Sequence, residues 1–305
     1  MKQNKILFLS LTISVIGIIL MIYYASISSF NDWHWKINPE LASQYGSFIS
    51  GITGPIFTLV GFLLIYETIR RQRIDFDKQQ FETKFFELVR YHRENVEQMT
   101  FKNSYSKTGN ITTGRQVIVE LKKQCHDIVE DIMLLIPKHN NQTDKEYIEN
   151  ILKISILIFY YGVSKRTKDT VLRILDNYIP TDKERIINEL RKKKTKYNDS
   201  IVFYGGHQSK LGNYFRHLFH TVRFVDESTC LNDSEKKSFI KILKAQLSNY
   251  EQALLFYNSM CPLGNKWREV GYILKYKMIN NLPPNFLGSV DFSQFYEMHY
   301  EYENY

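Results

Sequence analysis

The sequence predicts an all-α protein in two parts, an N-terminal two-helix transmembrane hairpin over residues 1–74 and a helical cytoplasmic domain over residues 75–305. The hairpin is predicted by two uncharged apolar stretches, residues 6–24 and 46–66, each about long enough to cross the hydrocarbon core of a bilayer. The domain is predicted by apolar residues that recur at helical spacing. No strand-like alternation of any length occurs, so we expect this domain to be overwhelmingly helical.

The membrane positions that bound or pack the two apolar stretches are Ile6, Tyr24, Gly46, Gly51, Gly54 and Tyr66. A cleaved signal peptide is the alternative for the first stretch, because Lys2 and Lys5 precede it, but the second stretch favours the hairpin. Small residues at positions 47, 50, 51 and 54 have helix-packing spacing, either against the first span or in self-association. Pro55 is expected to kink the second helix without ending it.

The basic residues near the two stretches predict the orientation of the hairpin. Lys2 and Lys5 precede the first stretch, arginines at positions 70, 71 and 73 follow the second, and the connecting loop offers only Lys36. Such residues are retained on the cytoplasmic side of a membrane. We therefore expect both termini in the cytoplasm, residues 25–45 outside, and the lipid bilayer as a partner of the chain.

Helices of the cytoplasmic domain are predicted from apolar spacing and from capping residues. The second span is expected to continue as a helix to about Met99, and a loop is expected over residues 102–111. Further helices are expected over residues 113–136, from Thr143 or Asp144 to Tyr161, over 167–178, from Thr181 to the basic run 191–196, over 233–260 and over 266–279. The basic run is either a solvated helix end or a patch that faces phosphate.

The strongest candidate site lies in residues 205–220. A glycine pair precedes a helix with an apolar stripe from Leu211 to Val222, and the opposite face carries a cation and two imidazoles. The candidate residues are Gly206, His207, Gln208, Asn213, Arg216, His217 and His220. Their face is either a solvated helix surface or a site in which Arg216 holds an anion and histidines move protons near neutral pH. The glycine-bearing turn also offers backbone N–H groups to an anion.

The helix predicted over residues 233–260 is apolar over so much of its circumference that we expect it at the centre of the domain. Four polar residues interrupt that surface: Gln246, Asn249, Glu251 and Asn258. A buried polar group without a partner costs about 1–3 kcal/mol. We therefore expect these four side chains either to meet the polar residues of 205–220 or to rim the helix at the surface.

Composition and missing motifs limit the other functions. The formal net charge of +8 suits work near acidic lipid or nucleic acid. Cys125, Cys230 and Cys261 are far apart and form no Cys-x-x-Cys pair, which argues against a zinc cluster and a disulfide framework. The sequence also lacks a P-loop, a dinucleotide fingerprint, a nucleophile elbow and a His-Glu-x-x-His motif. We expect neither a metal nor a cofactor.

Two segments, GGHQSKLGNYFRHLF at 205–219 and LKAQLSNYEQALLFYNSM at 243–260, resemble the putative phage abortive infection proteins, an AbiC-like family of bacterial defence proteins. The family is also similar in beginning with two membrane spans and in a Phe-Glu-x-x-Phe-Phe-x-Leu motif followed by a histidine, here residues 81–88 and His92. The resemblance extends over about residues 45–280. It implies an inner-membrane protein that stops phage propagation at the cost of the infected cell, and it assigns no catalytic residue.

Three functions are compatible with these features. In the first, the helical domain senses infection and the hairpin acts on the bilayer, which depolarises the cell. In the second, the chain is a membrane-tethered nuclease or nucleotide-processing enzyme in which His207 and His217 act as acid and base while Arg216 stabilises charge on phosphate. The Arg-x(4–6)-His spacing of helical defence ribonucleases is absent here. In the third, the same residues bind a phage component, nucleic acid or nucleotide signal without turnover.

Overall fold

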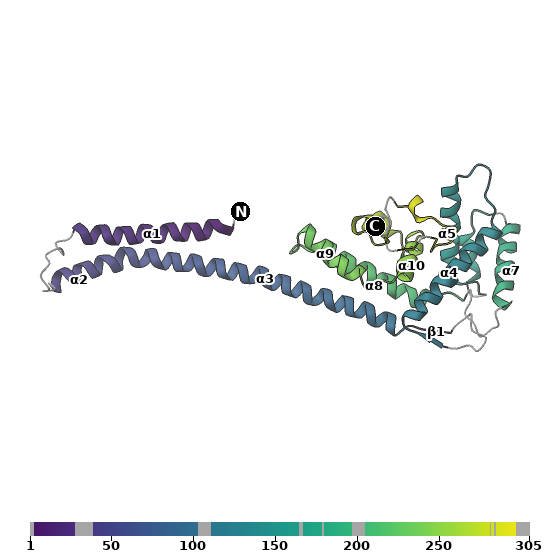
Figure 1. Cartoon of the computed structure of the whole chain (residues 1–305), viewed down its shortest axis with the longest axis horizontal. Helices are drawn as coiled ribbons and strands as arrows, with labels where there is room; N and C mark the ends of the chain where they lie inside the picture. The colour runs from purple at the N-terminus through teal and green to yellow at the C-terminus, as the bar shows by residue number, and fades with distance from the viewer. Residues whose placement is uncertain are drawn as a thin grey trace. The chain divides into compact units, whose positions relative to one another are not determined.

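The computed structural model describes residues 3–27, 39–102, 111–164, 167–178, 180–196, 205–280, 282–283 and 285–296. These residues are predominantly helical (Figure 1), which confirms the predicted all-α class. The chain divides into two compact units, Met1–Glu82 and Thr83–Tyr305.

The first unit holds α1 (Gln3–Ile27), α2 (Pro39–Phe48), the π-helical segment η2 (Ile49–Thr53) and the beginning of α3 (Gly54–Glu97). Helical residues run without interruption from 39 to 97, and the π-helical segment lies directly before Pro55. Proline lacks an N–H and its ring crowds the preceding turn, so the wider π turn accommodates it without ending the helix.

Within the first unit, α1 and the first part of α3 lie side by side and run in opposite directions (Figure 1). A glycine brings them close: a Cβ at Gly17 would lie 3.3 Å from Cγ2 of Ile56 and 3.6 Å from Cζ of Phe57. By contrast, a Cβ at Gly51 or Gly54 would meet no described atom within 4 Å. The close approach of the two helices at Gly17 therefore does not involve Gly51 or Gly54, although the segment Ile49–Thr53 does contact α1.

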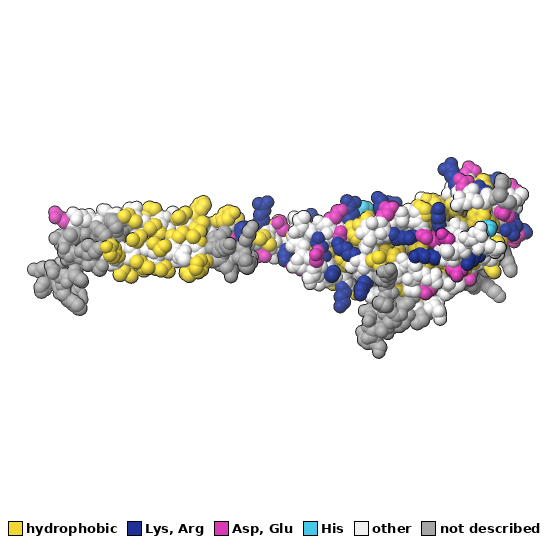
Figure 2. Space-filling view, turned by 90° about the horizontal axis from the view of Figure 1, so that it is seen from above, with side chains coloured by type: hydrophobic (Ala, Val, Ile, Leu, Met, Phe, Trp, Pro, Cys, Tyr) yellow, Lys and Arg dark blue, Asp and Glu magenta, His cyan; other side chains and the backbone are white. Residues whose placement is uncertain are grey.

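Apolar side chains gather on the described surface of α1 and of the first part of α3 (Figure 2). Phe8, Leu11, Phe62 and Tyr66 are each more than half exposed, and such surfaces belong to membrane-binding or protein-binding segments. Among the described residues one helix, Ser50–Glu97, is long and apolar enough to cross a membrane, while the apolar helix Phe8–Tyr23 is shorter. The two-pass hairpin therefore stays a prediction.

Several predicted membrane features fall outside the described part of the chain. The side chains of Ile6 and Tyr24 are not described, although both residues belong to α1. Residues 28–38, which include Lys36, also lie outside it.

The second unit begins with the end of α3 and continues through a small sheet, a set of helices and one 3-10 turn. The sheet is formed by β1 (Thr100–Lys102) and β2 (Ile111–Thr113), which pair antiparallel with Thr100 opposite Thr113. The helices are α4 (Arg115–Leu135), α5 (Asp144–Tyr161), α6 (Lys168–Ile174), α7 (Pro180–Lys196), α8 (Gln208–Asp226), α9 (Asp233–Lys244), α10 (Asn249–Ser259), α11 (Lys266–Glu269) and α12 (Tyr272–Tyr276), and the 3-10 turn is η3 (Phe292–Gln294).

The sheet is short, and the domain is otherwise overwhelmingly helical, as predicted. The sheet brackets the segment predicted as a loop, of which residues 103–110 lie outside the described part. The helix boundaries near α5 agree with their capping residues. Thr143 and Glu146 form a reciprocal capping box at its start, and Gly162 with φ 75° follows its end.

The core of the second unit forms where α10 packs against α4 and α5. Every residue from 251 to 259 in α10 is buried, so this helix exposes little of its surface to solvent. At the end of α7, Lys192 pairs with Glu189 at 2.7 Å and Lys193 pairs with Asp131. These two residues of the basic run thus have acidic partners.

The helix predicted over residues 233–260 is wrong in its continuity, because α9 ends at Lys244 and α10 begins at Asn249. Ser248 is the reason for the break: its side chain accepts from the N–H of Glu251, and the Glu251 carboxylate accepts from the N–H of Ser248. This capping box starts a new helix. The helix predicted over 266–279 is likewise two short helices, separated at Gly271 with φ 76°.

Candidate functional site

Helix α8 carries the residues of the predicted site, and its apolar stripe is buried as the spacing indicates: Leu211, Leu218 and Val222 are fully covered. The residues of the opposite face lie in two different places. Arg216 and His220 line a pocket on one side of the helix, whereas the ring of His217 stacks on His92 of α3, with 6.0 Å between the ring centroids. The residues of the predicted polar face therefore lie in two separate environments.

The pocket has a volume of about 440 Å³ and lies between α8, the end of α5, the end of α10 and the start of α11. Its lining residues are Tyr160, Gln208, Gly212, Phe215, Arg216, Phe219, His220, Arg223, Asn258, Leu263, Gly264, Lys266 and Trp267. We call this hollow the α8 pocket. Its volume is in the range typical of small-molecule sites.

The α8 pocket is positively charged. Arg216, Arg223 and Lys266 line it together with His220, and none of the described aspartates or glutamates does. Arg223 is paired with Glu227 at 2.7 Å. Among the described residues, neither Arg216 nor Lys266 has a hydrogen-bond or ion-pair partner for its side chain. These two cations are thus available to an anionic ligand.

Aromatic packing makes one wall of the α8 pocket rigid. Trp267 is only 2% exposed, and its ring meets Phe219 edge-on at 5.2 Å between centroids. Phe219 also contacts Tyr272 at 5.6 Å. Because these rings support one another, the apolar wall is already formed in the absence of a ligand.

Two glycines allow the chain to come close at the α8 pocket. A Cβ at Gly264 would overlap the backbone carbonyl of Asn258, and a Cβ at Gly212 would lie 2.8 Å from Oη of Tyr160. Asn258 itself is buried at the end of α10. Glycine at position 264 therefore fixes the floor of the pocket against α10.

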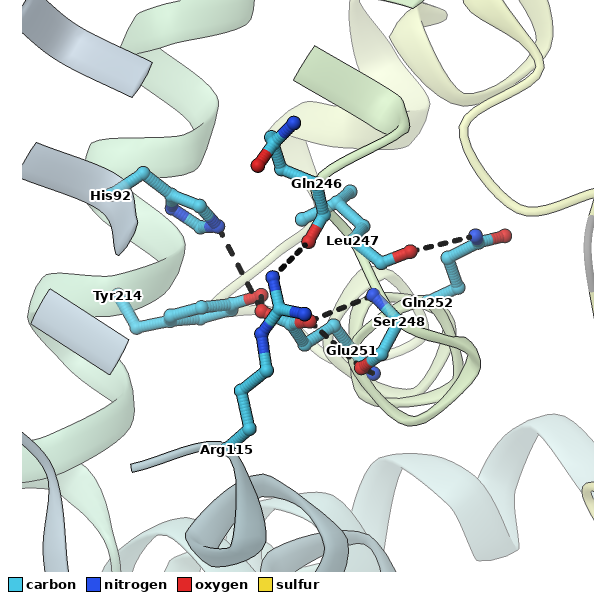
Figure 3. Close-up of polar contacts among 8 residues, drawn as sticks. All are labelled: His92, Arg115, Tyr214, Gln246, Leu247, Ser248, Glu251 and Gln252. Carbon is cyan, nitrogen blue, oxygen red and sulfur yellow. Dashed lines mark hydrogen bonds and ion pairs between the residues drawn. The ribbon is translucent and has the colours of Figure 1, made fainter. Parts of the chain in front are cut away.

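On the other side of α8 lies a buried polar cluster (Figure 3). Tyr214 donates a hydrogen bond of 3.1 Å to Oε1 of Glu251, and His92 Nε2 lies 3.9 Å from the same oxygen. The other oxygen, Oε2, accepts from the backbone N–H of Ser248 at 2.8 Å and from its hydroxyl at 2.7 Å. Arg115 approaches the same cluster and donates to the carbonyl of Gln246 at 3.1 Å.

Burial controls the charge of this cluster. It lowers the pKa of His92 to about 4, with a further contribution from the nearby His217 and Arg115. Burial also lowers the pKa of His217, and together with Glu251 it raises the pKa of Tyr214 well above its usual value. Among the described residues, the ring nitrogens of His92 and His217 have no hydrogen-bond partner. Both imidazoles are therefore held neutral at physiological pH.

His207 has a structural environment of its own. It is 2% exposed, its Nε2 lies 2.9 Å from Oε1 of Gln124, and its ring packs against Phe159 at 4.7 Å. Burial lowers its pKa to about 3. The preceding Gly206 has φ 89°, and a Cβ there would lie 2.6 Å from the carbonyl oxygen of Tyr161. This turn attaches the start of α8 to the end of α5.

The structure therefore places the predicted site residues in several separate environments. Gln208, Arg216, His220 and Asn258 come together in the α8 pocket. His217 and Glu251 lie in the buried cluster, where the carbonyl of Gln246 also takes part, and Gly206 and His207 lie against α5. Asn213 lines a smaller hollow of about 250 Å³, and Asn249 is half-buried in the first turn of α10. The three candidate catalytic residues thus do not converge.

Sequence reasoning missed several residues of the α8 pocket. Arg223 follows Arg216 by seven residues, so the helical period of the basic face could have identified it. The segment Gly264 to Trp267 combines a close-approach glycine with a cation and an aromatic ring. Only the fold brings that segment against α8, since it comes from a separate part of the chain.

Comparison with known protein families gives a match in the C-terminal part of the chain. Residues 206–287 match the model of the family described as "Putative phage abortive infection protein", a shorter stretch than the expected resemblance. No curated protein and no solved structure matches the chain. The matched stretch contains every lining residue of the α8 pocket except Tyr160, and it contains both Tyr214 and Glu251. Over residues 206–287, the chain is therefore similar to the putative phage abortive infection family.

Proposed function

We propose that this is a membrane-associated abortive infection protein, in which the second unit binds an anionic signal in the α8 pocket and the first unit acts on the bilayer. The family match supports the role in phage defence. The exposed apolar side chains of α1 and α3 support the association with a membrane. In this proposal both apolar segments cross the bacterial inner membrane, and both termini are cytoplasmic.

The observation that carries the sensing role is the unpaired charge of the α8 pocket. Arg216 and Lys266 line a preformed hollow without an acidic residue among its lining, beside the rigid ring of Trp267. Guanidinium and ammonium groups bind phosphate, and the half-buried ring of Phe219, packed against Trp267, offers a planar group an aromatic contact. The ligand class that fits both features is a nucleotide or a related phosphorylated compound.

The pocket favours binding over turnover. An acid–base pair of His207 and His217 acting on a phosphate at Arg216 requires these side chains to share one space, but His207 contacts Gln124 and His217 stacks on His92. Only His220 lines the pocket among the histidines of α8. The alternative, a membrane-tethered nuclease or nucleotide-processing enzyme, therefore rests on His220 as its proton-transferring group.

Thermal unfolding of the full-length protein in detergent tests the sensing role. A panel of nucleoside mono-, di- and triphosphates and cyclic nucleotides is added to the wild type and to Arg216→Ala. A ligand present at 100 times its Kd stabilises the folded state by about 2.7 kcal/mol, so a binder raises the unfolding temperature of the wild type only. Arg173→Ala, an exposed arginine on α6, is the matched control and should respond like the wild type.

Two results would contradict this part of the proposal. One is the absence of stabilisation by every phosphorylated compound. The other is equal stabilisation of the wild type and Arg216→Ala. Analysis of the same mixtures for product separates binding from turnover, and product formation that His220→Ala abolishes would support the enzyme instead.

A membrane-potential dye tests the effector role in infected cells. We expect depolarisation before lysis in cells that carry the wild type. Cells with Arg216→Ala should keep their potential while the protein still fractionates with the membrane. A constant potential up to lysis in wild-type cells would contradict the effector role, and recovery of the protein as a freely soluble species would contradict the membrane association.

A further inference from the structure

A second hollow of about 440 Å³ lies on the surface formed by α9 and α12, away from the lining residues of the α8 pocket. Five of its seven lining residues are lysines: Lys237, Lys241, Lys244, Lys275 and Lys277, with Ala245 and Tyr276 completing the set. We call it the lysine cleft. All of its lining residues lie within the matched stretch 206–287.

Some of these lysines lie at the C-terminal ends of helices. Lys241 and Lys244 stand in the last turn of α9, and Lys275 stands in the last turn of α12, where cations complement the helix dipole. Lys244 is held in place, because its Nζ donates to the carbonyl of Lys277 at 3.1 Å and to Oδ1 of Asn280 at 2.7 Å.

Acidic partners do not neutralise the lysine cleft. Lys275 pairs with Asp226, which also accepts from the hydroxyl of Tyr276 at 2.5 Å. Burial raises the pKa of Asp226, but the hydrogen bonds from Lys275 and Tyr276 outweigh it and lower that pKa overall. Lys237 and Lys241 have no hydrogen-bond or ion-pair partner among the described residues. Both ammonium groups are exposed, and a bound anion would offset their mutual repulsion.

The backbone at the edge of the cleft is unusual. Lys277 has φ 50° and ψ 53°, a left-handed conformation at the end of α12 where glycine is the common residue. This conformation places the Lys277 carbonyl within reach of Lys244. A lysine at a position that favours glycine keeps a cation at the cleft in spite of local backbone strain.

We propose that the lysine cleft binds a compact group that carries more than one phosphate. Several ammonium groups surround a single hollow, and each acts as a point charge toward phosphate oxygens. A di- or triphosphate group offers more oxygens and more negative charge to the lysines of both helices than a single phosphate does. A linear nucleic acid backbone fits less well, because it is bound along a groove with successive contacts. The inference does not depend on the ligand of the α8 pocket.

Calorimetric titration of the full-length protein in neutral detergent, at physiological ionic strength, tests the proposal with inorganic tripolyphosphate and orthophosphate as probes. We expect tripolyphosphate to bind at least tenfold more tightly than orthophosphate. Lys237→Gln combined with Lys241→Gln should weaken tripolyphosphate binding at least tenfold. These two lysines have no partners among the described residues, so their replacement should leave the fold intact, which the unfolding temperature verifies.

A control variant of equal net charge replaces two exposed lysines elsewhere in the second unit, Lys153→Gln with Lys168→Gln. It should bind tripolyphosphate like the wild type. Equal weakening of tripolyphosphate binding in both double variants would overturn the proposal, because the loss would then follow from the change in net charge alone. The absence of tripolyphosphate binding would overturn it as well, and so would a single-stranded oligonucleotide that binds at these lysines while tripolyphosphate does not.

The source of the phosphates is distinguished in lipid nanodiscs. If the cleft takes a lipid headgroup with two phosphates, cardiolipin should weaken tripolyphosphate binding, and an equal charge of phosphatidylglycerol should not. If the ligand is a free polyphosphate, both lipids should leave the affinity unchanged. Equal weakening by both lipids, retained in the Lys237→Gln, Lys241→Gln variant, would overturn the proposal.

Discussion

Tyr214 of α8 donates a hydrogen bond of 3.1 Å to Glu251 in the first turn of α10, and both side chains are about 1% exposed. The bond joins the two segments that resemble the abortive infection family, and both fall in the stretch that matches it. One oxygen of Glu251 serves the cap of α10 and the other serves α8. A single buried carboxylate thereby links the N-terminal cap of α10 to α8.

Tyr214→Phe should destabilise the protein by about 1–3 kcal/mol, because it removes the donor to a buried carboxylate oxygen and leaves the rest of the ring contacts intact. Chemical denaturation of the full-length protein in detergent measures this loss. Tyr250→Phe is a suitable control, since no hydrogen bond of its hydroxyl is found among the described residues. Equal stability of the two variants would contradict the role assigned to Tyr214.

Ser248→Ala should destabilise α10 by about 1 kcal/mol, because it removes the side chain that caps the Glu251 N–H. Ser248→Asn should recover most of that loss, since asparagine is an equally good N-cap residue. The comparison of the two variants by denaturation separates the capping function from any other effect of the substitution. A loss of the same size in both variants would exclude the cap as its cause.

The break at Ser248 was readable in the sequence, because Ser-x-x-Glu is a capping-box pattern. The long apolar periodicity on either side predicts one continuous helix instead, in which Glu251 is expected to meet the polar residues of 205–220 or to rim the helix. The period and burial of α8 and α10 followed from apolar spacing alone. The stacking of His92 on His217 could not be predicted, because spacing along the chain carries no information about which distant helices meet.

In the α8 pocket too, some residues can be predicted from the sequence and others only from the fold. Helical period placed Arg216 and His220 on one face of α8, as the structure has them. The same reasoning put His217 with them, but α3 covers that part of the helix. Lys266 and Trp267 could be found only from the fold, since the turn after α10 brings them back against α8.

Gly264→Ala should destabilise the protein by about 1–3 kcal/mol through overpacking, since the new Cβ would overlap the Asn258 carbonyl. The Cβ would also overlap Oδ1 of Asn258, so Asn258→Ala should rescue the variant only in part in a double-mutant cycle, because the backbone overlap remains. Full rescue by Asn258→Ala would show that the asparagine side chain, and not the floor of the α8 pocket, causes the strain. Denaturation of the two single variants and of the double variant checks this.

The buried histidines should make the second unit sensitive to mild acid. His92 and His207 have ordinary pKa values of 6.5 that burial lowers to about 4 and about 3 in the folded protein. Between pH 6.5 and these values the unfolded chain binds more protons than the folded one, so stability falls as the pH falls. At higher pH both states are neutral and the stabilisation is fully present.

Each of these histidines should account for a loss of about 2 kcal/mol between pH 6.5 and pH 5, since one pKa unit corresponds to about 1.4 kcal/mol. The groups that face His92 are Glu251, Tyr214, His217 and Arg115. His207→Gln can keep a hydrogen bond to Gln124 while it removes the titrating group. The free energy of unfolding, measured from pH 7 to pH 5, should therefore fall less steeply in His207→Gln than in the wild type. His139→Gln, at an exposed position, should keep the wild-type slope, and an unchanged slope in His207→Gln would mean that His207 is not held neutral by the fold.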